Sequence, residues 1–257
     1  MELANTLVSL HSISFAQSAK AVMKKLGLIG GMSWESTVSY YQAINRGINT
    51  QLGGLHSAKL LLSSVDFAEI AHLQHQDEWP ALANALSKEA INLQTAGADA
   101  ILICTNTMHK VADEVEASIA IPLIHIADAT GQLLKQQGVK TIGLLGTRFT
   151  MEQAFYKNRL KEKFDIDVVV PNASQRDLVH KIIYEQLCKG VICNASREAY
   201  IEIIDMLAEN GAEGVILGCT EITLLIQQAH TSVCLYDTTA IHAHAAIEFA
   251  LSNSTQV

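Results

Sequence analysis

Two short apolar runs that each end in Cys-Thr constrain the fold of this chain more than any other feature. The first lies within residues 100–107 and the second within residues 215–221. A continuous aliphatic run of this length, preceded by Gly-Ala-Asp or Gly-Ala-Glu, is typical of a strand buried on both faces of a parallel sheet. Open α/β sheets bind ligands at the carboxyl ends of such strands. We therefore expect Cys104 and Cys219 to lie where chemistry takes place.

The surroundings of the two runs repeat along the chain. Gly-Leu-Ile-Gly at 27–30 returns as Gly-Leu-Leu-Gly at 143–146, a shift of 116 positions, and the two cysteines are 115 positions apart. Nearly constant shifts across half the chain indicate an internal duplication. The sequence therefore predicts an α/β protein with two similar lobes, each a small parallel sheet flanked by helices, with the active site in the cleft between them.

The same pattern gives the expected boundaries. The first α/β lobe is predicted over residues 24–127 and the second over 128–237, with a closing helix in 238–257 that packs on the first lobe. Residues 1–23 are interpreted as an N-terminal extension, since they lack the basic cluster of a signal peptide and Met23 directly precedes the first strand. Strands are expected at 26–30, 59–65, 100–104, 122–126, 141–146, 167–171, 215–219 and 233–236.

The composition of the chain argues against several classes of function. A net charge of −8 opposes nucleic acid as the main partner, because no basic surplus is available to neutralise phosphates. No apolar run approaches the roughly 20 residues that cross a bilayer. Five cysteines without regular spacing do not form a disulfide framework, so a reducing cytoplasm is the expected setting.

Cofactor motifs are incomplete. Gly30-Gly31 follows the first strand, but the third glycine of a dinucleotide fingerprint is missing. Cys188 and Cys234 are interpreted as core residues. Cys193 lies near Cys188, but no paired His or Cys completes a tetrahedral zinc site, so no metal is expected.

Two thiols on opposite faces of one carbon can invert a stereocentre. One thiolate removes a proton and the other thiol returns a proton to the far face. Both thiols then need a pKa closer to the working pH than about 8.5, and the amino termini of helices lower thiol pKa values. Residues 105–107 and 220–221 are placed at such helix starts, where backbone N–H groups can also hold a carboxylate.

At these motifs the sequence resembles the cofactor-independent aspartate/glutamate racemase family, over nearly everything from Lys24 onward. The resemblance is carried by Cys-Thr-Asn-Thr at 104–107, Gly-Cys-Thr-Glu at 218–221 and Gly-Gly-Met at 30–32. Cys-Thr-Glu, where glutamate racemases have Cys-Thr-His, is similar to the aspartate racemase branch. Ser-Trp at 33–34, where many relatives have Gly-Pro, is similar to the subgroup with broad amino-acid specificity.

The resemblance implies roles for particular residues. Cys104 and Cys219 are the expected acid/base pair of a racemase that needs neither pyridoxal phosphate nor metal and acts on aspartate, glutamate or further amino acids. Family members suggest a homodimer. The implied substrate-binding residues are Met32, Asn106, Thr107 and Thr220, with Lys59 and Arg176 reaching a distal carboxylate; Glu221 and His109 are auxiliary candidates.

Other readings remain open from the residues alone. Glu221 in a first helical turn also simply stabilises its helix, and His109 can be an ordinary helix residue. A dicarboxylate isomerase or a decarboxylase of the same fold would use a cysteine as nucleophile or as single proton donor. A non-catalytic amino-acid sensor would use the same duplicated fold without turnover.

Overall fold

The computed structural model describes residues 23–252, so the interpretation of residues 1–23 as an extension lies, except for Met23, outside the described residues. The first sheet has three parallel strands in the order β2 (Leu60–Ser64), β1 (Leu26–Gly30) and β3 (Ala100–Ile103). Leu26 of β1 stands opposite Leu60 and Ala100 in this register. All five residues of β1 are buried, as expected for a strand covered on both faces.

The second sheet repeats this arrangement and adds a strand. Its parallel order is β5 (Asp167–Val169), β4 (Thr141–Leu145), β6 (Val215–Leu217) and β7 (Leu235–Asp237). In both sheets the glycine-containing strand is central and the strand leading to Cys-Thr lies beside it. The predicted fold class, two similar parallel-sheet lobes flanked by helices, is confirmed.

The strand expected at 122–126 is not formed. Only one bridge, from Leu123 to Ile101, joins this segment to the first sheet. His125 ends the extended stretch because its ring nitrogen Nδ1 accepts the N–H of Ala127 and so caps the next helix.

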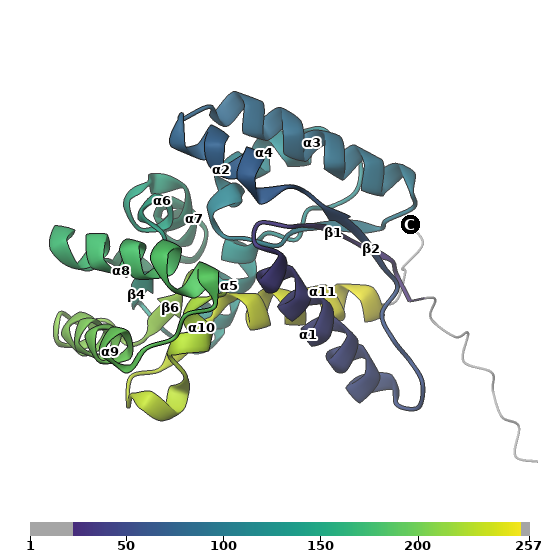
Figure 1. Ribbon diagram of the computed structural model, residues 1–257. Coiled ribbons are helices and arrows are strands. Elements are labelled where there is room, and N and C mark those ends of the chain that lie inside the picture. The colour runs from purple at the N-terminus through teal and green to yellow at the C-terminus, as the bar shows by residue number, and fades with distance from the viewer. Residues whose placement is uncertain (1–22, 253–257) are drawn as a thin grey trace, which may run out of the picture.

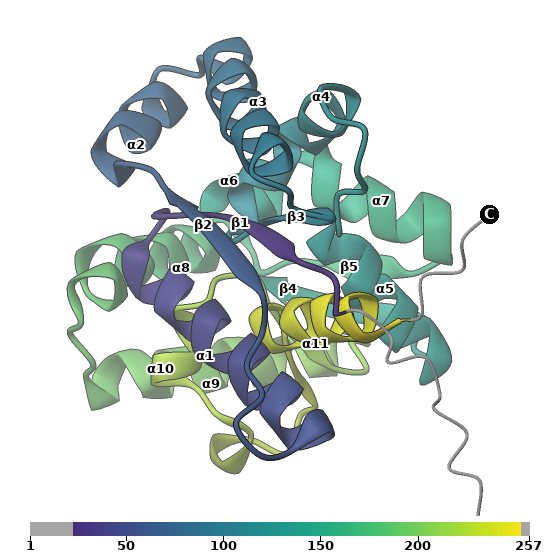
Figure 2. The same cartoon turned by 90° about the vertical axis from the view of Figure 1, so that its right-hand side faces the viewer.

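Helices cover both faces of each sheet, as Figures 1 and 2 show. The helices before the second sheet are α1 (Trp34–Leu52), α2 (Phe67–His75), α3 (Trp79–Thr95), the 3₁₀ turn η1 (Thr107–Val111), α4 (Ala112–Ala117) and α5 (Ile126–Gln136). Those after its first strand are α6 (Arg148–Glu152), α7 (Ala154–Phe164), α8 (Ala173–Glu185), η2 (Leu187–Lys189), α9 (Asn194–Glu209), α10 (Ile222–Leu225), η3 (Gln228–His230) and α11 (Thr238–Leu251).

Each sheet separates two apolar layers. In the first lobe α3 packs on the face that carries Ile29 and Ile101, and α1 packs on the face that carries Leu28. In the second lobe α8 and α9 cover one face, while α5 and α7 cover the other. Burial of these aliphatic side chains is the main stabilising term of both lobes.

The last helix returns to the first lobe. α11 follows β7 of the second sheet but packs against α1 and α5 (Figure 2). The approach to α1 is close: a Cβ added at Gly47 would lie 2.2 Å from Ile247 Cδ1. α11 therefore ties the second lobe to the first.

A glycine turn aligns the ends of β1 and β2. Gly31 has a φ of +91°, and a Cβ there would lie 2.2 Å from the carbonyl oxygen of Val65. Only glycine fits this approach and this backbone conformation. The turn brings Met32 and Ser33 to the carboxyl edge of the first sheet, where Ser33 caps α1 by accepting the N–H of Ser36.

Candidate active site

Both Cys-Thr motifs begin where their strands end. Cys104 directly follows β3, and its backbone N–H donates to Ile29 O on β1 at 2.9 Å. Cys219 follows β6 after Gly218, whose N–H donates to Leu145 O on β4 at 2.6 Å. The two cysteines therefore stand at the carboxyl ends of parallel strands, one in each lobe.

A serine of α1 joins the two motifs. Ser36 Oγ lies 2.8 Å from Thr220 Oγ1 and 3.4 Å from the carbonyl oxygen of Cys104. Ser36 and Cys104 belong to the first lobe and Thr220 to the second. The two strand ends therefore face each other across the cleft.

The motifs enclose a cavity of about 30 Å³, which is room for one or two water molecules. The first lobe lines it with Met32, Ser33, Ser36, Phe67, Gln74 and residues 105–107, and the second with Thr147, Ile183, Tyr184, Cys188 and residues 218–221. Near its rim α2 and α8 meet through an edge-to-face contact of His75 and Tyr184, with ring centroids 6.3 Å apart. An amino acid is larger than this cavity, so binding one requires the cleft to widen.

Cys219 is bonded to a carboxylate. Its Sγ donates to Glu221 Oε2 at 2.9 Å, and Ser33 Oγ donates to Glu221 Oε1 at 2.7 Å. Burial raises the pKa of the Cys219 thiol well above its ordinary value, and the nearby Glu221 carboxylate raises this pKa further. The expectation that a helix terminus lowers this pKa is wrong, because burial and Glu221 outweigh the short helix α10.

Cys104 lies in apolar surroundings. It is completely buried in the cluster between the first sheet and α1, where Tyr40 and Ala243 also pack. Burial raises the pKa of the Cys104 thiol far above its ordinary value, so a lowered pKa is contradicted here as well. The neighbouring residues 105–107 line the cavity, whereas Cys104 stands one residue behind its wall.

Asn106, which lines the cavity, has a side-chain oxygen without a partner. The carbonyl of Leu217 can only accept, so Thr238 Oγ1 donates to it at 2.9 Å and must accept from Asn106 Nδ2, which lies at 3.0 Å. This assigns the amide orientation and leaves Asn106 Oδ1 buried without a partner. A buried acceptor of this kind indicates a place for a ligand donor.

The other predicted substrate-binding residues divide into two groups. Met32, Thr107 and Thr220 line the cavity with Asn106. Lys59 does not, because it precedes β2 and therefore lies at the amino end of the strand, opposite the site. Arg176 does not either: its guanidinium donates to Glu152 Oε1 at 2.9 Å and to Pro171 O at 2.7 Å.

His109 lies behind the cavity wall and not in it. Its Nδ1 is 2.8 Å from Thr105 O and must carry the proton, so Nε2 accepts the N–H of Ile126 at 3.2 Å. Burial, with the neighbouring His125 and His242, lowers the pKa of His109 well below its ordinary value. Neutral His109 thus ties the residue after Cys104 to the start of α5.

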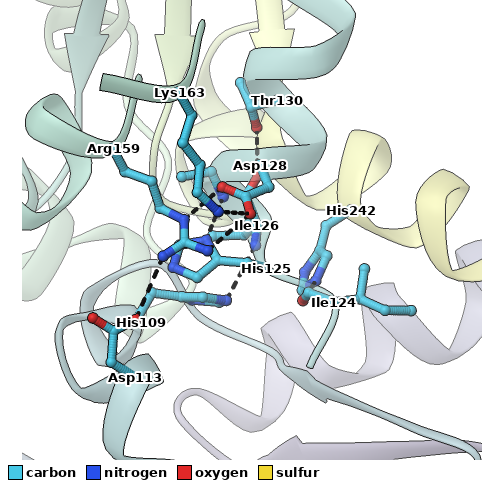
Figure 3. A network of polar contacts seen from close by, with 11 residues as sticks. His109, Asp113, Ile124, His125, Ile126, Asp128, Thr130, Arg159, Lys163 and His242 are labelled. Carbon is cyan, nitrogen blue, oxygen red and sulfur yellow. Dashed lines mark hydrogen bonds and ion pairs between the residues drawn. The ribbon is translucent and has the colours of Figure 1, made fainter. Parts of the chain in front are cut away.

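Figure 3 shows that His109 belongs to a larger network between the lobes. Its ring centroid lies 4.5 Å from that of His125 and 5.7 Å from that of His242. Arg159 and Lys163 of α7 both bind Asp128 of α5, each with an N–O distance of 2.8 Å. Burial and the nearby Arg159 lower the pKa of His125 to about 2.

His242 connects this network to Cys104. Its Nε2 lies 2.6 Å from Ile124 O and must donate, so Nδ1 accepts from the Tyr40 hydroxyl at 2.8 Å. Burial lowers the pKa of His242 to about 4. The sequence alone favours a surface or packing role for His242, and no motif points to Tyr40.

No sequence motif indicated several of the residues that line the cavity. Cys188, expected in the core, lines the cavity from η2, and Tyr184 and Ile183 line it from α8. Phe67 and Gln74 reach it from α2. Thr147 could have been found from the sequence, because it follows Gly146, where the second glycine turn repeats the first. Its hydroxyl lies 3.1 Å from that of Thr107.

Within residues 23–252 no three His, Cys, Asp or Glu side chains gather to hold a metal ion. Over the same range, none of the helices combines the length and the apolar character that crossing a bilayer requires.

The two α/β lobes enclose a small cavity where their strand ends face each other. This arrangement is typical of an enzyme that acts on a small molecule. The family model for Asp/Glu/hydantoin racemases matches residues 29–246. The chain belongs to this family and is an isomerase of the racemase class, as the motifs had indicated.

Three relatives illustrate this relationship. A crystal structure from Yersinia pestis, provisionally assigned as an Asp/Glu racemase, is 57% identical and superposes with a TM-score of 0.85 over 90% of this chain and 100% of that one. An aspartate racemase homologue from Pyrococcus horikoshii OT3 is 36% identical, with a TM-score of 0.78 over 90% and 100%. The broad specificity amino-acid racemase RacX of Bacillus subtilis (strain 168) is 20% identical over 66% of this chain and 73% of RacX.

Proposed function

We propose that this protein is an amino-acid racemase that uses Cys104 and Cys219 as opposed acid and base. The observation that carries the proposal is the Ser36 contact, which joins the two duplicated strand ends across one cavity. A racemase needs one proton-transfer group on each face of the α-carbon. A cysteine from each lobe meets that need once the cleft widens to admit the amino acid and opens the wall in front of Cys104.

In this mechanism Glu221 prepares Cys219. Glu221 Oε2 accepts the Cys219 proton along their 2.9 Å hydrogen bond, and the thiolate then removes the α-proton of the substrate. Cys104, a thiol in its apolar surroundings, gives its proton to the opposite face. The reverse reaction runs the same transfers backwards, with Cys104 as base.

The groups around the α-carbon would hold the amino acid in place. The unpaired Asn106 Oδ1 can only accept hydrogen bonds, so we assign it to the ammonium group of the substrate, which donates them. We assign the α-carboxylate to the Thr107 and Thr220 hydroxyls and to the backbone N–H groups of Asn106 and Thr107. This changes the role that resemblance implied for Asn106, which was carboxylate binding.

The proposed chemistry needs no pyridoxal phosphate and no metal, because side chains supply both proton transfers. Activity should therefore survive extended dialysis against EDTA and against hydroxylamine. Loss of activity that returns on adding metal or pyridoxal phosphate would contradict this part of the proposal.

We further propose a homodimer in the reducing cytoplasm. Reduced thiols are required at both bases, and the free cysteines of the chain fit that setting. Trp34, Val38 and Tyr41 lie at helical spacing on α1 and are 66%, 44% and 54% exposed, an apolar stripe suited to a second copy. Sedimentation of the wild type and of Tyr41→Glu tests it: the wild type should be a dimer and the variant a monomer.

The decisive test is α-proton exchange in D₂O without added cofactor. L-aspartate, L-glutamate, L-asparagine and L-glutamine, in separate tubes, should be followed by proton NMR and by chiral analysis. Loss of the α-proton signal with growth of the D-isomer for any of them supports a racemase. Tight binding without exchange would instead indicate a sensor, and turnover of maleate an isomerase.

A further inference from the structure

We propose that the side-chain end of this site selects amino acids with uncharged side chains and discriminates against aspartate and glutamate. The inference rests on the proposed racemase function. It concerns the part of the cavity that faces away from the two strand ends, where Phe67 and Gln74 of α2 meet Ile183, Tyr184 and Cys188 of the second lobe.

The first reason is the lack of a cation. None of the cavity-lining residues in the described part of the chain is Lys, Arg or His. Basic side chains on the neighbouring helices are engaged elsewhere: Arg176 binds Glu152, Arg148 binds Asp177 at 2.7 Å, and Nδ1 of His75 at the rim donates to Ala71 O at 2.6 Å. His180 stacks on Tyr184, and burial with the nearby Arg148 lowers the His180 pKa, so this ring is neutral.

The second reason is that two neutral groups placed to hold an anion, the start of α2 and the Ser33 hydroxyl, are already occupied. Asp66 caps α2 by accepting the N–H of Ala68 at 3.0 Å, so an acidic side chain fills that helix terminus. Ser33 donates its hydroxyl proton to Glu221. A distal carboxylate would find these donors used.

The third reason is the charge of the cavity itself. Among the described residues that line the cavity, Glu221 is the only one with an ionisable carboxyl group, and it accepts hydrogen bonds from Ser33 and Cys219. A second carboxylate in the same small, buried space would be repelled by Glu221 and stripped of water. The α-carboxylate escapes this penalty, because the backbone N–H groups of Asn106 and Thr107 can hold it.

An uncharged side chain fits the same wall. Phe67, Ile183 and Cys188 offer apolar contact. Gln74 donates one of its two Nε2 hydrogens to Met108 Sδ at 3.0 Å, so its amide oxygen can accept from a substrate donor and its second N–H can donate to an uncharged acceptor. Side chains with an amide, a hydroxyl or a short aliphatic group are therefore the expected substrates.

Isosteric pairs test the inference directly. L-asparagine differs from L-aspartate, and L-glutamine from L-glutamate, in charge and hardly in size. We expect kcat/KM for racemisation of the better amide to exceed that of its acid by about 100-fold or more, since an unpaired buried carboxylate costs several kcal/mol. Aspartate or glutamate turned over as fast as its amide would overturn the inference and leave the racemase standing. No exchange with any amino acid would overturn both.

A cation placed in the wall should reverse the preference. Ile183→Arg puts a guanidinium beside the side-chain end, and Ile183→Met, of similar length without charge, is the matched control. We expect the ratio of acid to amide kcat/KM to rise at least about 10-fold in Ile183→Arg and to stay within about 2-fold in Ile183→Met. Because the readout is a ratio within one variant, partial loss of folded protein does not affect it. If Ile183→Arg does not fold at this buried position, the amide and acid pairs on the wild type still decide the inference. An unchanged ratio in Ile183→Arg would contradict the proposed position of the side chain.

Discussion

Cys104 and Cys219 occupy equivalent points of the two halves, yet their surroundings differ. Cys219 is half-buried and donates to the Glu221 carboxylate, whereas Cys104 is fully buried beside Tyr40. The duplication preserved where each thiol stands on its sheet and not what touches it. A two-base racemase can use this difference, because at any moment one group must take a proton while the other gives one.

The largest effect is expected from removing either thiol. Cys104→Ser and Cys219→Ser should each lower kcat for racemisation by about 1000-fold or more, since a hydroxyl is a far weaker acid and base near neutral pH. Each variant should still exchange the α-proton of one enantiomer, and the two variants should prefer opposite enantiomers. Exchange of the same enantiomer by both would contradict opposed bases.

A smaller loss of activity is expected when Glu221, the hydrogen-bond partner of Cys219, is altered. Glu221→Gln keeps the shape but cannot take the thiol proton, so kcat should fall about 100-fold. Removing the carboxylate should also lower the pKa of Cys219, since the negative charge raises it. Alkylation of Cys219 by iodoacetamide, followed by mass spectrometry, should shift to lower pH.

Glu69→Gln on the exposed side of α2 is the control for this variant and should change neither measurement. If the pH profile of Cys219 alkylation is unchanged in Glu221→Gln, Glu221 does not influence the Cys219 pKa. The difference drawn between the two thiols would then be wrong.

The histidines near Cys104 should make the stability of this part of the fold more sensitive to acid than that of the part around Cys219. His242 has a pKa of about 4 in the folded protein and about 6.5 when unfolded, so the unfolded state binds more protons between these values. Its contribution to stability is complete above pH 6.5 and is lost as pH falls toward 4, about 3 kcal/mol for this group. His109 and His125, with pKa values lowered in the same direction, should add to the loss.

Urea unfolding between pH 7.5 and 4.5 measures this loss. His242→Gln keeps a donor for Ile124 O without a titrating group and should give a flatter dependence of the unfolding free energy on pH. A slope equal to that of the wild type would show that His242 does not titrate on unfolding.

The smallest effect is expected at the thiols outside the cavity. The expectation that Cys234 is a core residue is wrong, because its side chain is exposed. Cys193 is hydrogen-bonded to Ser196, which lowers the Cys193 pKa. Cys234→Ser and Cys193→Ser should change kcat by less than about 2-fold. In the wild type these two thiols should be alkylated first and Cys104 last. Early alkylation of Cys104 would contradict its enclosed position.

The sequence determined much of this protein on its own. Unbroken aliphatic runs and the glycines before them specified buried parallel strands, and the repeat specified two lobes. Strand direction then sufficed to place Cys104 and Cys219 at the carboxyl edges. The same rule counts against Lys59 at a strand start, because the amino end of a parallel strand lies opposite the site.

Only the tertiary structure decided what surrounds each thiol. The helix-start motif predicted lowered thiol pKa values, but burial raises the pKa of both thiols and Glu221 raises that of Cys219 further. Desolvation of this kind depends on residues far away in the chain. Gln74 and Cys188 reach the cavity from segments with no motif. Short-range patterns fix strands and turns, whereas the lining of a cleft between lobes depends on how those lobes pack.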